Sequence, residues 1–253
     1  MKIVIIGGTG FIGSKVADNL RRLGHTVVAA APSTGINTIT GEGLAEALQE
    51  TDVVVDISNS PSLEDSVAID FFTNSSRNLL AAEKKAGVKH HLVLSIVGAD
   101  LIDMGYMHAK KAQEDLAKEA GVPYTIIRST QFFEFVPAIT GAAKQGNEAH
   151  VSDISFQPIA AEDVAKLITE LALAHPANGT VEIAGPERHT MSDFVAFFVK
   201  EMGGTETVVT NHNSDYFGVR IPGYALVPQG ELKVGQMKFK EWISHQQIKS
   251  QPE

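Results

Sequence analysis

The 253-residue chain contains no cysteine. This absence excludes disulfides, thiolate metal sites and thiol nucleophiles, and it agrees with a reducing compartment. Long hydrophobic runs are also absent, since no apolar stretch approaches the roughly 18 residues of a membrane span. Basic residues are outnumbered, because 21 Lys and Arg face 30 Asp and Glu, and the formal net charge is −9. Nucleic acids and anionic membranes usually bind a basic face, so we expect neither as a partner.

No targeting segment is visible, because Met1 leads directly into an apolar run, and the sequence therefore predicts a cytoplasmic location. The nine histidines include the pair His90 and His91, but no carboxylate or further histidine stands around them at a recognised ligand spacing. We interpret the pair as the polar entrance to a strand and expect no metal site. Hydrophobic residues make up 43% of the chain, which is typical of a globular protein.

Residues 2–13 combine an apolar run with a glycine-rich turn. The run 3–6 consists of Ile and Val, which suits a strand buried on both faces of a parallel sheet. Gly7, Gly10 and Gly13 then allow a sharp turn and a close approach of the backbone to a bound group. A helical pattern of apolar residues starts inside the glycines, at Ile12 and Val16.

A helix that begins at such a turn points unpaired amides and the positive end of its dipole at any ligand there. The context of strand, turn and helix therefore predicts a site for a dinucleotide pyrophosphate, to which Thr9, Phe11 and Ile12 also belong. The alternative is a tight turn that binds nothing.

Apolar runs and helical patterns alternate strictly as far as Arg128. We expect strands at 26–31, 52–56, 91–97 and 124–128, and helices at 42–49, 65–86 and 105–120. This alternation specifies an α/β fold, a Rossmann-type doubly wound parallel sheet with right-handed crossovers.

Beyond Arg128 the pattern changes. The sequence predicts a helix at 132–146 that leaves the sheet, an amphipathic helix at 160–175, a strand at 180–183, and helices at 191–202 and 237–246. We therefore expect a single domain over 1–253, in which roughly 130–150 and 185–253 form a small C-terminal substrate-side lobe.

The second expected strand ends without an acid, because no Asp or Glu occurs between Asp18 and Glu42. An acid at this point would accept a hydrogen bond from the 2′-hydroxyl of NAD. Ser33 and Thr34 can instead donate to a 2′-phosphate, so the sequence favours NADP, with NAD as the alternative cofactor. Ordinary turn chemistry after a proline is the other interpretation of these two residues.

A possible catalytic group follows the fourth strand. Ser95 lies near the end of this strand, and Tyr106 and Lys110 share one face of the next helix. Lys110 is predicted to lower the pKa of the Tyr106 phenol, while Ser95 hydrogen-bonds a substrate carbonyl. The alternative is that Lys110 pairs with Glu114 on a solvated face.

These motifs together resemble the atypical short-chain dehydrogenase/reductases of the NmrA-like group. The resemblance rests on glycines 7, 10 and 13, on Ser95 and Tyr106-x-x-x-Lys110, and on the phrases at 121–128, 131–134 and 182–187. It implies that Ser58 and Asn59 line the cofactor groove, that Ser129, Gln131 and Phe132 lie over the nicotinamide, and that Lys110 also holds the cofactor. Many NADP-using members carry an Arg where this chain has Pro32 or Ser33.

The group includes reductases of quinones and other carbonyls, and also regulators that bind the dinucleotide without turning it over. We therefore predict an NADP-dependent oxidoreductase in which Tyr106 donates a proton, Lys110 lowers its pKa and Ser95 orients a carbonyl or quinone. The alternative is a redox-sensing regulatory protein. A sugar epimerase or dehydratase is less favoured, since no pocket for a nucleotide-sugar can be identified. Gln131, Phe132, Phe133 and Phe135 suggest an apolar substrate pocket, or else ordinary core.

Overall fold

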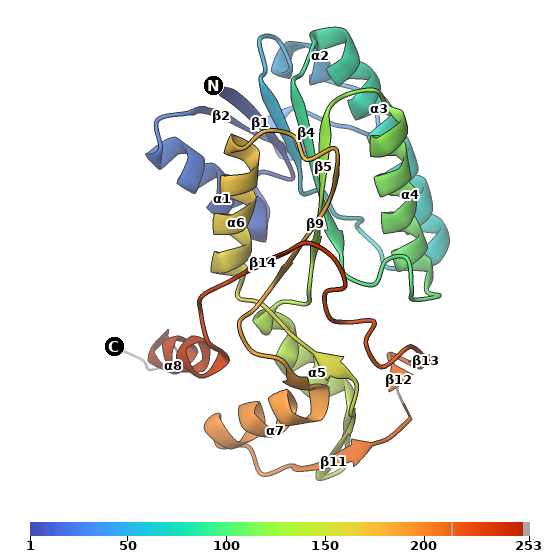
Figure 1. Ribbon diagram of the computed structural model, residues 1–253, viewed down its shortest axis with the longest axis vertical. Helices are drawn as coiled ribbons and strands as arrows, with labels where there is room; N and C mark the ends of the chain where they lie inside the picture. The colour runs from blue at the N-terminus through green and yellow to red at the C-terminus, as the bar shows by residue number, and fades with distance from the viewer. Residues whose placement is uncertain (214, 250–253) are drawn as a thin grey trace.

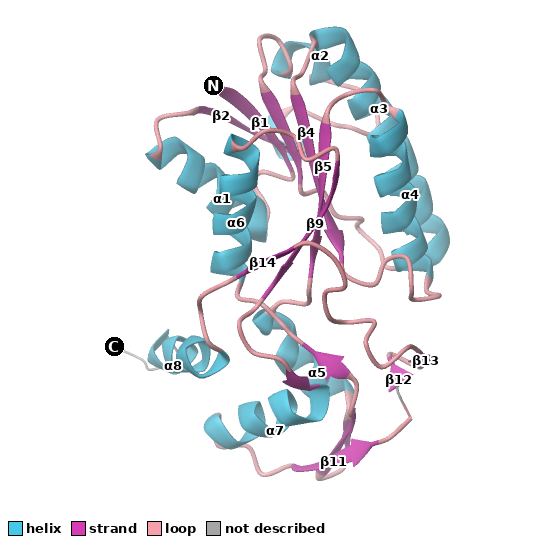
Figure 2. Ribbon diagram, in the orientation of Figure 1, coloured by secondary structure: helices cyan, strands magenta, loops and turns pink. Residues whose placement is uncertain are grey.

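A computed structural model describes residues 1–213 and 215–249. Its centre is a parallel sheet of seven strands (Figure 2). They are β1 (Lys2–Ile6), β2 (Thr26–Ala30), β3 (Val53–Asp56), β4 (His90–Ile96), β5 (Tyr124–Ser129), β9 (Gly179–Ala184) and β14 (Leu232–Val234). The order across the sheet is β14-β9-β5-β4-β3-β1-β2, and every pair is parallel. The predicted doubly wound α/β fold is confirmed.

Helices cover both faces of this sheet (Figure 1). One face carries α1 (Phe11–Arg22) and α6 (Ala161–Leu173), and the other carries α2 (Leu44–Ala47), α3 (Asp65–Ala86) and α4 (Gly105–Glu119). Side chains alternate along a strand, so β1 sends Ile3 and Ile5 into the core with α1 and α6, whereas Val4 and Ile6 join α2 and α3. Burial on both sides explains why β1 has no polar residue after Lys2.

The strand order reverses between β1 and β3. In open α/β sheets, ligands bind beyond the carboxyl ends of the strands at such a reversal. Gly7 leaves β1 at this point with a φ of +75°, and a Cβ there would stand 2.7 Å from the Ile57 carbonyl oxygen behind β3. The glycine turn and the residues after β3 therefore lie together at the topological switch point.

A second core lies beyond the carboxyl edge of the sheet. It is built from η2 (Phe133–Phe135), α5 (Val136–Ala142), β6 (Lys144–Gln145), β7 (Glu148–Ser152), β8 (Ser155–Phe156), β10 (His189–Thr190), α7 (Met191–Glu201), β11 (Thr207–Asn211), β12 (Asp215–Tyr216), β13 (Val219–Arg220) and α8 (Phe239–Lys249). Its centre is a set of buried aromatic rings, Phe133, Phe156, Phe194, Phe239 and Trp242. Figure 1 shows this lobe below the strand ends.

One expectation for the second half of the chain is wrong. The helix predicted at 132–146 is a short 3-10 turn followed by α5, which ends at Ala142 and leads into the antiparallel pair β6 and β7. Gly146, with a φ of +64°, makes the turn of this hairpin, and Ala149 and Val151 show the alternate burial of a strand. The segment 185–253 contributes most of its residues beyond the sheet edge, and it also supplies β14, which pairs with β9 in the main sheet. None of the helices in the described ranges is long and apolar enough to cross a bilayer.

Candidate functional site

Helix α1 starts without a side-chain cap. Its N-cap is Gly10, and its first turn contains no acidic residue. The first amides of a helix have no partner inside the helix, so here they remain free to bind an anion. A Cβ on Gly13 would stand 2.1 Å from the Gly7 carbonyl oxygen, whereas a Cβ on Gly10 would stand 3.2 Å from it. Gly13 is therefore required by packing, and Gly10 keeps the outer surface of the turn open.

The residues between these glycines differ in exposure. Thr9 and Phe11 lie at the surface, whereas the side chain of Ile12 is buried in the core. The Lys15 ammonium sits 5.4 Å from the centre of the Phe11 ring and pairs with Glu162 of α6 at 3.1 Å. Ile12 can reach a ligand only through its backbone.

Buried hydroxyls without partners mark the ends of β3 and β5. Ser58 Oγ and Thr130 Oγ1 are buried and have no hydrogen-bond partner among the residues that the structure describes. Both residues come within two positions of a strand end, at the edge where a dinucleotide binds in this topology. Because a buried polar atom without a partner is costly, these hydroxyls fit a site that a polar cofactor completes. Thr130 lies within the stretch 129–132 that the resemblance places over the nicotinamide, although it was not named as a site residue by itself.

The segment after β5 is partly aromatic. Ser129 donates to the Thr130 carbonyl at 2.8 Å, so its hydroxyl is already engaged. Gln131 is buried and faces the Tyr216 hydroxyl, and burial raises the pKa of Tyr216 to about 12. Phe132 stacks on the exposed Phe135, with ring centres 5.7 Å apart. Phe133 belongs to the buried core of the lobe, and a pocket lined by Phe132 and Phe135 stays a prediction.

Tyr106 and Asn59 meet at the carboxyl edge of the sheet. The Tyr106 hydroxyl, from the first turn of α4, donates to Asn59 Oδ1 at 2.5 Å. Phe72 packs edge-to-face against the same ring. Burial raises the pKa of Tyr106 to about 12, and no neighbouring cation opposes this rise.

Lys110 is buried with 3% exposure and makes no hydrogen bond to Tyr106. Its ammonium donates to Gln113 Oε1 and lies 4.4 Å from the centre of the Phe72 ring. Gln113 in turn donates to Asp56 at 2.9 Å. Burial lowers the pKa of Lys110 to about 8, although Asp56 and Glu114 act in the opposite direction. The solvated pair with Glu114 is therefore not formed.

Ser95 belongs to an internal ion-pair network. Its side chain is 2% exposed and donates to Glu114 Oε1 at 2.6 Å. Arg128 binds both oxygens of Glu114, at 2.9 and 2.8 Å, and donates to Asp100 at 2.7 Å. The structure thus places the Ser95 hydroxyl between β4 and α4, and not at the surface where a substrate carbonyl was expected to meet it.

At the end of β2, Ser33 and Thr34 have different roles. They lie in the 3-10 turn η1 (Pro32–Thr34), where Thr34 Oγ1 accepts from the Ala31 amide at 3.0 Å and donates to the Ala31 carbonyl at 2.9 Å. Turn chemistry therefore explains Thr34. Ser33 is exposed and makes no hydrogen bond among the described residues.

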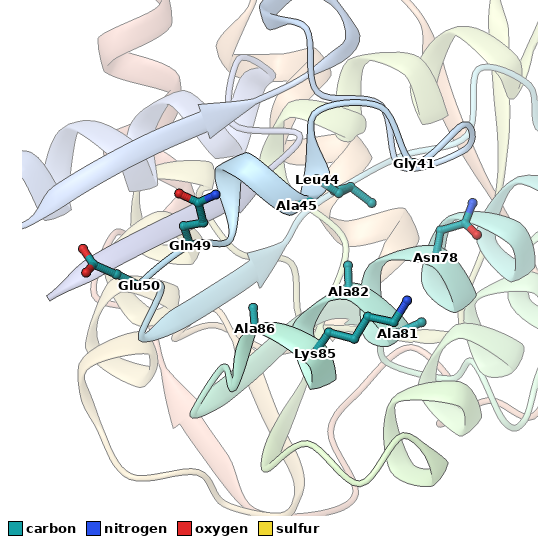
Figure 3. A pocket seen from close by; sticks show the side chains of 10 residues that line it. All are labelled: Gly41, Leu44, Ala45, Gln49, Glu50, Asn78, Ala81, Ala82, Lys85 and Ala86. Atoms are coloured by element: carbon teal, nitrogen blue, oxygen red, sulfur yellow. The ribbon is translucent and has the colours of Figure 1, made fainter.

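A shallow groove of about 720 Å³ lies between α2 and α3 (Figure 3). It is lined by Gly41, Leu44, Ala45, Gln49, Glu50, Asn78, Ala81, Ala82, Lys85 and Ala86. Glu50 and Ala86 stand just before β3 and β4, so the groove reaches the amino edge of the sheet. Ligands of open α/β sheets bind at the other edge, and we assign this groove no chemistry. In the described ranges, no three His, Asp or Glu residues are placed to hold a metal ion.

Residues 7–176 match the model of a protein family described as NAD(P)H-binding. The photosystem II assembly factor Ycf39 of Synechocystis sp. is 26% identical over 149 residues, which cover 53% of this chain and 46% of that protein. The chloroplastic divinyl chlorophyllide a 8-vinyl-reductase of Cucumis sativus is 24% identical over 222 residues, which cover 73% of this chain and 52% of that protein. This chain thus spans about half the length of these curated relatives.

The structure is also similar to the crystal structure of dTDP-4-dehydrorhamnose reductase from Bacillus anthracis in complex with NADP. The TM-score is 0.72 at 16% sequence identity, and the match covers 99% of each chain. At this identity the likeness concerns the fold. It agrees with the switch-point site, because that fold binds a dinucleotide at the carboxyl edge of its sheet.

Proposed function

We propose, because this chain belongs to the NAD(P)H-binding family, that it is a reductase that delivers a hydride from NADPH to a carbonyl or a quinone. The observation that carries the proposal is the convergence at one sheet edge of an uncapped helix start, two unpartnered buried hydroxyls and the Tyr106 phenol. The relatives include a reductase by name, which supports this reaction class. The more detailed resemblance to NmrA-like short-chain dehydrogenase/reductases remains a prediction.

In this proposal, the start of α1 holds the pyrophosphate through its free amides. Ser58 and Thr130 donate to, or accept from, the polar groups of the nicotinamide half. When bound, the cofactor would supply a hydride for the carbonyl carbon of the acceptor. Tyr106 then gives its phenolic proton to the carbonyl oxygen, so that an alcohol and the oxidised cofactor are formed.

Lys110 and Ser95 take supporting roles in this arrangement. Lys110 is buried on the helix face of Tyr106, where it donates to Gln113 and lies over Phe72, so its proposed role is to hold Phe72 against the Tyr106 ring. Ser95 holds Glu114 and so fixes α4, which carries Tyr106, against the sheet.

A second candidate is a redox-sensing protein that binds the dinucleotide without turning it over. One observation favours it: Ser95 and Lys110 hydrogen-bond to Glu114 and Gln113, and neither contacts the Tyr106 hydroxyl. Such a protein needs the glycine turn but no proton donor.

A panel of quinones and aldehydes, assayed with NADPH and with NADH, separates the two candidates. A reductase oxidises NADPH only when an acceptor is present, and the absorbance of the reduced cofactor falls in proportion to product. A sensor binds NADPH by calorimetry, and no acceptor in the panel accelerates its oxidation. Preference for NADPH over NADH is expected in either case, because no acid stands beside Ser33 to select the 2′-hydroxyl.

A further inference from the structure

Of the two carboxylate oxygens of Glu134, one accepts a hydrogen bond and the other has no partner in the part of the chain that the structure describes. Trp242 of α8 donates its indole N–H to Glu134 Oε1 at 3.1 Å. The second oxygen, Oε2, is buried and has no hydrogen-bond partner among the described residues. Burial raises the pKa of Glu134, and nearby Glu162 raises it further, whereas its own backbone amide, the Trp242 N–H and the Ala161 amide lower it. A buried acceptor without a partner is costly unless a ligand completes it.

Glu134 lies at the edge of the sheet where the dinucleotide binds. The segment that contains it runs beside the start of α6, because the Ile159 amide donates to Gln131 and the Phe133 amide donates to Ile159, both at 2.9 Å. Glu162, in the first turn of α6, pairs with Lys15, and Lys15 covers the ring of Phe11 in the first turn of α1. A continuous series of contacts therefore connects Glu134 to the glycine turn.

Tyr106 approaches the same edge from the opposite face. It belongs to α4, which covers the sheet together with α3 (Figure 1). Glu134 instead bonds Trp242 of α8 and lies near the Ala161 amide at the start of α6. A nicotinamide ring bound at the end of β5 would be approached by Tyr106 from one face of the sheet and by Glu134 from the other.

The C-terminal tail, residues 229–242, carries Trp242 and is fixed by carboxylates that accept hydrogen bonds from its backbone amides. Glu182 accepts from Gln229 at 2.6 Å, and Asp163 accepts from Gln236 and Met237 at 2.7 Å. Glu187 accepts from Phe239 at 2.7 Å. Trp242 then packs on Phe133 and Phe239 and reaches Glu134. The indole is therefore rigidly placed, and so is the carboxylate that it orients.

We propose that Glu134 is a cofactor-binding residue whose free Oε2 accepts a hydrogen bond from the nicotinamide half of NAD(P)H, with Trp242 as its positioning residue. The donors available on that half are the carboxamide N–H and the ribose hydroxyls. The inference rests on the cofactor binding that the proposed function includes, and it adds a contact that neither the glycine turn nor Tyr106 supplies.

The test compares three variants by calorimetric titration with NADPH and with 2′,5′-ADP, which lacks the nicotinamide half. Glu134→Gln leaves one acceptor oxygen for two donors, so the Kd for NADPH should rise about tenfold or more. The Kd for 2′,5′-ADP should not change. Trp242→Phe keeps the ring in the aromatic core but removes the N–H, and it should weaken NADPH by a smaller factor. Glu148→Gln alters an exposed carboxylate of the lobe that pairs with His150 and makes no hydrogen bond or ion pair to the tail within the described part of the chain, and it should bind both ligands like the parent.

Fluorescence supplies a readout without cofactor, since Trp242 is the sole tryptophan of the chain. An unchanged emission maximum in Glu134→Gln shows that the tail stays docked. Equal NADPH affinity in Glu134→Gln and the parent overturns the inference and leaves the proposed function standing. A parallel loss for NADPH and 2′,5′-ADP also overturns it, because the effect then arises from the fold. If the parent binds no dinucleotide, the proposed function fails together with the inference.

Discussion

The glycine turn after β1 and the side chains around α4 lie at the same edge of the sheet, but they are built in opposite ways. The turn is made by backbone: Gly13 lets α1 approach Gly7, and the start of α1 is left without a side-chain cap. The region around α4 is made by side chains that hydrogen-bond to one another: Ser95 donates to Glu114, and Lys110 donates to Gln113. A backbone site has one geometry and exists before a ligand arrives. A side-chain site depends on which of several partners each group selects.

This difference separates two parts of the proposed function. Anion binding needs only free amides and a helix dipole, which the turn already presents. Proton transfer needs a phenol with a suitable pKa, and burial alone moves that of Tyr106 the wrong way, to about 12. Binding and turnover should therefore respond to different substitutions, and four variants test this.

Tyr106→Phe should have the largest effect. It removes the phenolic proton and keeps the ring against Phe72, so kcat for an acceptor that the parent reduces should fall by about 10²- to 10⁴-fold. Affinity for NADPH should barely change. The measurement is steady-state kinetics beside calorimetry, with Tyr124→Phe as the control because Tyr124 begins β5 at the opposite edge. Full activity in Tyr106→Phe shows that hydride transfer proceeds without this acid.

Gly10→Val should abolish cofactor binding with little effect on the fold. A Cβ here only touches the Gly7 carbonyl oxygen, at 3.2 Å, but the branched side chain covers the amides at the start of α1. We expect the Kd for NADPH to rise by about 100-fold, roughly the loss of two charge-assisted hydrogen bonds. Gly179→Val, at the amino end of β9, is the matched control. If the Gly10→Val protein is folded and binds NADPH with the parental affinity, the assignment of the pyrophosphate to the glycine turn is wrong.

Lys110→Met should stabilise the protein at neutral pH while it reduces turnover. Because burial lowers the pKa of Lys110 to about 8 from 10.5, the charged form is disfavoured in the folded state. Below about pH 8 the lysine is protonated in both states and the whole penalty is present. Between about pH 8 and 10.5 the unfolded state binds more protons, so stability rises with pH. The gain in Lys110→Met should be on the order of 1 to 3 kcal/mol at pH 7.

Thermal unfolding from pH 6 to pH 10.5 measures this effect. The difference in Tm between Lys110→Met and the parent should shrink as the pH passes through the titration range of Lys110. Lys118→Met, on the exposed side of the same helix, should show no such dependence. A difference that is constant with pH contradicts the buried position of Lys110.

Ser33→Asp should have the smallest effect, on cofactor preference alone. Ser33 is exposed and unbonded among the described residues, so a carboxylate there can accept from a 2′-hydroxyl and repel a 2′-phosphate. We expect the ratio of NADH to NADPH affinity to rise about tenfold, and Ser33→Asn to leave it near the parental value. An unchanged ratio in Ser33→Asp places the adenosine ribose elsewhere.

The sequence by itself determined the first half of the fold. The spacing of apolar residues and the Gly and Pro residues at the ends of elements were sufficient there, because each βα unit buries an unbroken apolar strand against an amphipathic helix. The helix predicted at 65–86 is α3 (Asp65–Ala86), and the strand at 52–56 is β3 with one residue fewer. The glycine turn was likewise readable, since only residues without Cβ fit against Ile57 and Gly7.

Tertiary structure decided what local pattern does not encode. The lobe is made of strands as short as two residues, and β14 joins the main sheet by pairing with β9, next to the point where Glu182 accepts from the Gln229 and Gly230 amides. Tyr106 and Lys110 share a helix face, yet each takes its partner from elsewhere, Asn59 from the loop after β3 and Gln113 from the next turn. Glu134 and Trp242 stand 108 positions apart in the chain and meet only because α8 packs on Phe133. Spacing places a side chain on a face, but its partner depends on packing between elements that are distant in the sequence.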